Sequence, residues 1–203
     1  MWASKGISSD PDDPRRIGYS GRRPFPREMT LEISWTKRAL RLPPEVRVEL
    51  VAMLEGLSLF FPEMKTKMKI GITRFYDGLV FQSNEGRVKL MVDVHKTRKG
   101  VWKYPTHWTL AHEFMHLAQF NSEGIPSGER ACDVYTLSRL PPELIDEAPS
   151  YLVVSKGTRK IWGIRHAKIA HALAKEALRQ RDNGHKRYAL WWEDEFEERG
   201  ENI

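Results

Sequence analysis

The stretch THWTLAHEFMHLAQFN, residues 106–121, decides the fold. Its apolar side chains recur at the spacing of one helix face, at Leu110, Phe114, Leu117 and Ala118. Thr106 precedes them and is a residue type that caps the start of a helix. We therefore predict a helix that begins after Thr106 and ends near Asn121.

A second helix is predicted to follow after a short connection. It starts near Pro126 and stops before Pro141, because proline does not continue a helix. Its expected buried side chains are Ala131, Val134, Leu137 and Leu140. A short connection makes the two helices neighbours in space.

The first helix carries the segment His112-Glu113-Phe114-Met115-His116. Residues four apart on a helix lie one turn above each other, so His112 and His116 can present two imidazole nitrogens to one metal ion. Neutral imidazole is a good zinc ligand. Glu113 would lie beside the ion, where it can accept a proton from bound water. The alternative is that both histidines are ordinary surface or core residues.

A catalytic zinc site needs a third protein ligand. Glu129 and Asp133 share one face of the second helix. We expect Glu129 to bind the metal and Asp133 to accept a hydrogen bond from the far nitrogen of His112. Glu123 is an alternative third ligand, but it falls where the first helix ends and has no Asp four residues later.

These two motifs resemble the gluzincin metallopeptidases typified by thermolysin, over about residues 106–140. The resemblance implies that His112, His116 and Glu129 bind one zinc ion per chain and that Glu113 is the general base. It implies that Asp133 supports His112. The expected activity is hydrolysis of peptide bonds in a peptide or protein, by a zinc-bound water that Glu113 activates.

The spacing from His116 to Glu129 is short, so the chain looks like a minimal single-domain gluzincin. Another class of zinc peptidases, the metzincins, needs Gly and His at the positions where this chain has Gln119 and Ser122, so its pattern of ligands is absent. The resemblance also implies a zincin-like sheet whose edge strand holds substrate, and residues 87–94 are the segment that we expect at that edge.

The segment before the motifs predicts an α+β domain. A helix is expected over residues 46–57, and three strands are expected between residues 68 and 94. We predict a small, mostly antiparallel sheet packed on helices. Residues 1–28 are expected to form a flexible arm, and residues 29–203 a single domain.

The C-terminal part, about residues 156–203, is predicted to be helical and basic. A long helix is expected over residues 157–181 and a short one over 188–198. Between residues 156 and 187 there are ten Lys or Arg. This run could bind nucleic acid or an acidic partner, or it could be a solvated helix face. A metal-stabilised regulatory protein, or a peptidase acting on nucleic-acid-bound proteins, is the alternative function.

Other residues receive weaker predictions. Tyr135, Tyr151, His166 and His171 are candidates for the oxyanion-stabilising group that the family supplies with His or Tyr. His95, His107 and Cys132 are expected to be packing residues, without chemistry. With one cysteine, no leader-like segment and no long apolar stretch, the protein is predicted to be cytoplasmic, with no membrane contact.

Overall fold

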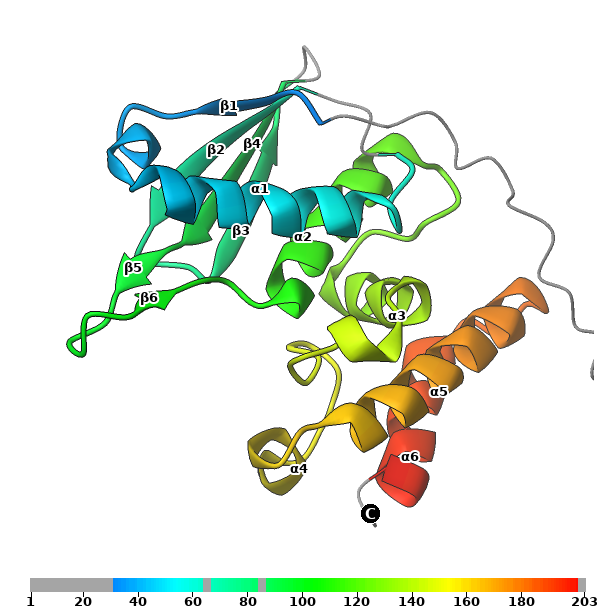
Figure 1. The fold of residues 1–203 in the computed structure, drawn as a ribbon. Helices are drawn as coiled ribbons and strands as arrows, with labels where there is room; N and C mark the ends of the chain where they lie inside the picture. Colours follow the sequence, from blue (N-terminus) through cyan, green and yellow to red (C-terminus); the bar gives the residue numbers. More distant parts are fainter. Residues whose placement is uncertain (1–30, 64–66, 84–86, 201–203) are drawn as a thin grey trace, which may run out of the picture.

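The computed structural model describes residues 31–63, 67–83 and 87–200 (Figure 1). The predicted arm, residues 1–28, lies outside the described residues. The described part combines a small sheet with helices, so the prediction that the domain contains both helices and strands is confirmed.

Four strands form the main sheet, in the order β1-β2-β4-β3. They are β1 (Ile33–Trp35), β2 (Met68–Thr73), β3 (Gly78–Gln82) and β4 (Val88–Asp93). β1 pairs with β2 and β2 with β4 in parallel, whereas β3 and β4 are antiparallel. The prediction of a mostly antiparallel sheet is therefore wrong.

Burial explains this strand order. The parallel register sets Met68 opposite Val88 and Ile70 opposite Leu90, and all four side chains lie in the core. An antiparallel succession of β2, β3 and β4 would place β3 in the middle, although none of its residues is fully buried. β3 is instead an edge strand. The predicted edge segment, residues 87–94, lies inside the sheet, and that prediction is also wrong.

The described residues contain six α-helices. They are α1 (Pro44–Ser58), α2 (His107–Asn121), α3 (Glu129–Arg139), α4 (Lys156–Lys160), α5 (Ile164–Asp182) and α6 (Tyr188–Gly200). Shorter elements are the 3₁₀ helices η1 (Ala39–Arg41) and η2 (Pro142–Leu144), and the paired strands β5 (His95–Lys96) and β6 (Trp102–Lys103). The predicted helices over 46–57 and 106–121 are confirmed.

The predicted single helix over 157–181 is interrupted between α4 and α5. The indole nitrogen of Trp162 donates to the carbonyl oxygen of Ile145 at 3.1 Å, and its ring stacks on His166 with 5.5 Å between centroids. Gly163 is extended at this point, with φ −163°. Glycine is unfavourable inside a helix, so the chain turns here.

α2 is central to the packing. It contacts β3 and α1 as well as α3, and α5 packs on α3 and α6 (Figure 1). Phe114 of α2 meets Phe61 edge to face at 5.7 Å. The motif is therefore carried by a helix that is packed from several sides. Within the described residues, no helix has the length and apolar character needed to cross a membrane.

Candidate metal centre

The start of α2 is tied down by two neighbouring segments. The hydroxyl of Thr106 accepts the backbone N–H of Thr109 at 3.0 Å, as predicted for a capping residue. From the loop after η2, Asp146 accepts the backbone N–H groups of His107 and Trp108 at 2.9 and 3.0 Å. These bonds satisfy donors that a helix start leaves free, so the position of α2 is well defined.

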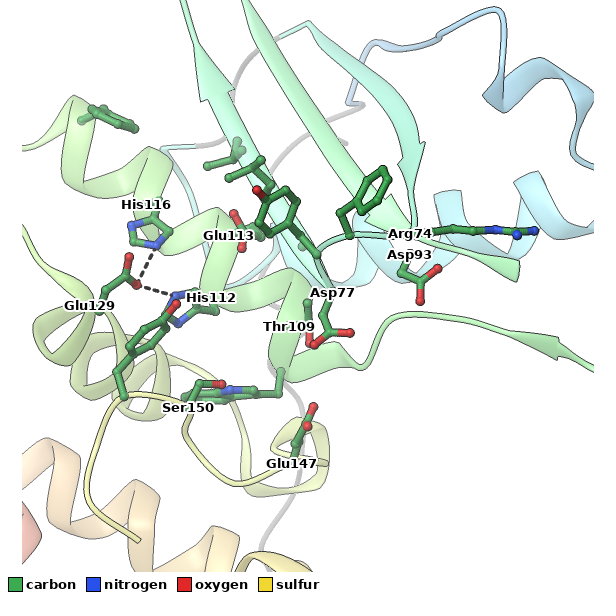
Figure 2. A pocket seen from close by; sticks show the side chains of 18 residues that line it. Arg74, Asp77, Asp93, Thr109, His112, Glu113, His116, Glu129, Glu147 and Ser150 are labelled. Atoms are coloured by element: carbon green, nitrogen blue, oxygen red, sulfur yellow. Dashed lines mark hydrogen bonds and ion pairs between the residues drawn. The ribbon is translucent and has the colours of Figure 1, made fainter. Parts of the chain in front are cut away.

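The neighbouring helix brings Glu129 to the two histidines. The Oε2 atom of Glu129 lies 3.1 Å from Nε2 of His112 and 3.1 Å from Nε2 of His116 (Figure 2). Glu129 is the first residue of α3, after Gly128, which has φ +105°. Few residues other than glycine adopt that conformation, so Gly128 allows α3 to begin next to α2.

Asp133 holds the other nitrogen of His112. Its carboxylate is completely buried, and Oδ1 lies 2.9 Å from Nδ1 of His112. Oδ2 accepts the backbone N–H groups of Tyr151 and Leu152 at 2.6 and 3.1 Å. A carboxylate only accepts, so Nδ1 of His112 carries a proton, and in the neutral imidazole the lone pair of Nε2 faces Glu129.

Gln119 holds Nδ1 of His116 in the way that Asp133 holds Nδ1 of His112, a role that we did not predict from the sequence. Its side-chain nitrogen donates to the carbonyl oxygens of Pro126 and Gly128 at 2.7 and 3.2 Å. Its Oε1 therefore faces Nδ1 of His116, 2.9 Å away, and accepts a hydrogen bond from its N–H. The signal was available, because residues three apart on a helix are neighbours.

Three electron-pair donors thus converge on one point. With both Nδ1 atoms protonated, two imidazole lone pairs and one carboxylate oxygen face each other, and this arrangement is unfavourable without a cation or a shared proton. Two ligand atoms about 2.1 Å from one tetrahedral zinc ion lie roughly 3.4 Å apart. The two observed separations of 3.1 Å are close to that value. The residues therefore fit a zinc ion.

Electrostatics favour a cation at the same point. Burial by itself would lower the pKa of His112, but the hydrogen bond and charge of Asp133, with Glu113 and Glu129 nearby, raise it overall. The surroundings of the imidazole are thus negative enough to overcome the cost of burying positive charge.

Cys132 also lies near the histidines. Ligand atoms of His112, His116 and Cys132 lie within 4.8 Å of one another, so these three could also hold a metal. The thiol is fully buried, however, and donates to the carbonyl oxygen of His112 at 3.3 Å. Burial, with Asp133 and Glu129 nearby, raises the pKa of the thiol well above its usual value, which opposes the thiolate that a metal needs.

Glu113 lies in the same cleft but does not belong to the cluster. In Figure 2 it lies on the side of α2 nearer the strands, whereas His112 and His116 face Glu129. Glu113 is 7% exposed and accepts the backbone N–H of Val80 in β3. Burial raises its pKa, and the nearby His112 and His116 offset this only in part. A raised pKa makes this carboxylate a stronger proton acceptor than an ordinary glutamate.

β3 packs closely on Glu113. A Cβ atom added at Gly78 would lie 2.8 Å from Cγ of Glu113 and 2.9 Å from Cγ2 of Thr109. Only glycine allows this approach without displacing a side chain.

The cleft around these residues has a volume of about 740 Å³. It is lined by residues 74–80, by residues of α2 with Glu129, and by Glu147, Ser150 and Tyr151. Large exposed aromatic side chains also line it, namely Phe75, Tyr76, Phe120 and Tyr151. An open cleft of this size, with an apolar rim and a polar floor, suits a ligand with several side chains.

The candidates for oxyanion stabilisation lie in different places. Tyr151 lines the cleft, and its ring stacks on His112 with 5.5 Å between centroids. The other three are not among the residues that line it. Tyr135 lies under Arg181, His166 stacks on Trp162, and His171 bonds the carbonyl oxygen of Leu137 through Nδ1.

The remaining candidates also lie outside the cluster. Glu123, the alternative third ligand, is exposed and does not line the cleft. His95 bonds Asp93, and His107 bonds Asp146, each through Nδ1 at 2.9 Å.

Comparisons of the chain with protein families, with curated proteins and with solved structures returned no match.

Proposed function

We propose that the chain is a zinc-dependent peptidase of the gluzincin type. The observation that carries the proposal is the convergence of three atoms, His112 Nε2, His116 Nε2 and Glu129 Oε2. The Glu129 oxygen lies 3.1 Å from each of the two nitrogens. Asp133 and Gln119 orient the two imidazoles so that both lone pairs face this point. Three such ligands and an adjacent acid are the composition of a catalytic rather than a structural zinc site.

A bound zinc ion would supply a Lewis acid, which lowers the pKa of water and polarises a carbonyl group. The protein's own contribution begins with Glu113. Its carboxylate, not needed as a ligand, accepts a proton from the attacking water and delivers it to the leaving amine. The Val80 N–H and the close packing of Gly78 hold this carboxylate in place.

An extended polypeptide is the substrate that the cleft suits best. β3 pairs with β4 on one side, and Gly78, Leu79 and Val80 line the cleft. Apart from the Val80 N–H, which Glu113 accepts, the outer edge of β3 can offer backbone donors and acceptors to an extended chain. The aromatic rim can cover its side chains, and the Tyr151 hydroxyl is the candidate donor for the oxyanion.

The test separates the roles of three acidic residues. Glu113→Gln should retain zinc and lose about a hundredfold or more in peptide turnover, the usual scale for a general base. Glu129→Ala should weaken zinc binding strongly, because only two protein ligands remain. Glu123→Ala is the matched control and should change neither quantity.

Zinc affinity by chelator competition and cleavage of a broad peptide library are the measurements. Loss of zinc in Glu123→Ala but not in Glu129→Ala would show that the third ligand is misassigned. A zinc-loaded protein that cleaves no peptide in the library would favour the rival function, a metal-stabilised binding protein.

A further inference from the structure

A second, smaller hollow lies at the C-terminal end of β2, where Ile72 and Thr73 line it. Its volume is about 280 Å³, and four cationic side chains line it, Arg38, Arg41, Arg74 and Lys96. Its remaining lining includes Leu42, Val94 and Trp102, and no Asp or Glu is among the lining residues. We call it the basic hollow. Arg74 also lines the larger cleft, so the two depressions adjoin.

The cationic side chains of the basic hollow have no acidic partner among the described residues. All four cationic side chains are exposed, and none makes an ion pair or hydrogen bond with another described side chain. One acid lies beside the hollow: Asp93 lines the adjoining cleft, and its carboxylate contacts Nδ1 of His95 at 2.9 Å. Four like charges around one concavity repel each other unless an anion lies between them.

The β5–β6 hairpin extends this charge beyond the hollow. Residues 95–103 contain Lys96, Arg98, Lys99 and Lys103 and no acid. The hairpin turn is well formed, because Thr97 accepts the backbone N–H groups of Gly100 and Val101. In Figure 1 the hairpin projects from the body of the molecule. The basic surface therefore extends from the hollow along the β5–β6 hairpin.

The basic run over residues 156–187 is a weaker site than its composition indicates. Arg159 donates to the carbonyl oxygens of Val154 and Leu152, and Arg181 donates to that of Gly124. Arg179 pairs with Glu176. Part of this charge thus serves the fold, and α5 and α6 lie far from the hairpin in Figure 1.

We propose that the basic hollow and the β5–β6 hairpin bind the phosphate backbone of a nucleic acid. The hollow, with a volume of about 280 Å³, has room for a phosphate group, and the exposed hairpin cations extend the positive surface beyond it. Trp102, half-buried in the hollow, offers an aromatic surface for a sugar or base. These contacts would be made to phosphates and not to base edges, so binding should not depend on the nucleotide sequence.

The experiment compares two triple charge reversals by fluorescence anisotropy. The first, R38E/R41E/K96E, alters the hollow but leaves Arg74, which lines the cleft, unchanged. The second, R165E/K168E/K175E, makes the same charge change at exposed positions of α5. The probes are labelled DNA of about 20 nucleotides, single-stranded and as a duplex, between about 50 and 200 mM salt. Metal-free and zinc-loaded protein are both measured.

The unaltered protein should bind one or both probes, with an affinity that falls steeply with salt. The hollow variant should bind at least about tenfold more weakly at low salt, with a salt slope smaller by about two to three. The α5 variant should change affinity by less than about threefold. R38Q/R41Q/K96Q, which removes charge without reversing it, should fall between the hollow variant and the unaltered protein. Unchanged thermal melts should accompany these results.

Three results would overturn the proposal: no binding at low salt, a larger loss in the α5 variant, or equal losses in both. Displacement of DNA by polyglutamate at equal charge concentration would also overturn it, since the site would then recognise an acidic polypeptide. Because the measurement uses metal-free protein as well, its result does not depend on whether the cleft is a peptidase.

Discussion

Replacing Asp133 by Asn changes one atom and should reverse the proton position on a proposed zinc ligand. The Oδ2 atom of Asp133 accepts two backbone N–H groups, of Tyr151 and Leu152. The amide oxygen of Asn must take that place, so its NH₂ group faces Nδ1 of His112. Nδ1 then becomes an acceptor, and the proton moves to Nε2, which no longer has a lone pair for a metal.

The magnitude follows from the alternatives open to Asp133→Asn. To bind zinc, the variant must either give up the bond from its NH₂ group or turn its amide, which leaves the buried N–H groups of Tyr151 and Leu152 without an acceptor. A buried polar group left without a partner costs about 1–3 kcal/mol. Zinc affinity should therefore fall by about 5- to 140-fold.

The assay is chelator competition at constant pH, with thermal melts of the metal-free proteins beside it. Asp146→Asn is a close control, because Asp146 also accepts two backbone N–H groups and faces a histidine Nδ1, that of His107, away from the cluster. It should keep its zinc affinity. If Asp133→Asn binds zinc within about twofold of the unaltered protein, the tautomer argument is wrong.

Four further outcomes are expected. Gln119→Leu should weaken zinc binding by about tenfold, because Nδ1 of His116 loses its acceptor, and chelator competition measures it. Cys132→Ala should leave zinc affinity within about twofold, since its thiol is protonated and bonded to the backbone; a loss comparable to that of Glu129→Ala would make sulfur the ligand. Gly78→Ala should lower peptide turnover by about ten- to a hundredfold with zinc retained, because the new Cβ displaces Glu113, and steady-state kinetics with metal analysis measure both. Zinc at about 100 times its dissociation constant should stabilise the fold by about 2.7 kcal/mol, which denaturant titrations with and without chelator would detect.

Local features of the fold were predictable from the sequence because they depend on neighbouring residues. The cap at Thr106, the helix that follows it and the spacing of His112 and His116 all lie within one short segment. Glu129 and Asp133 are four residues apart, so the helix period alone sets them on one face. The proximity of the two helices followed from the short connection between them.

Long-range choices were decided only by the tertiary structure. Short turns between successive strands predict antiparallel neighbours. In the structure β2 and β4, which are buried, pair with each other in parallel, and β3 is the edge strand next to Glu113. The interruption of the long helix at Gly163 depends on a bond from Trp162 to the distant Ile145.

The surroundings of the proposed zinc ligands were decided in the same way. Asp133 meets the backbone of residues 151 and 152, and Gln119 meets that of residues 126 and 128. The basic hollow gathers Arg38, Arg74 and Lys96 from three segments whose charges are unremarkable in sequence. Helix periodicity is a property of adjacent residues, whereas strand order, buried hydrogen-bond partners and charge density depend on which distant segments the core brings together.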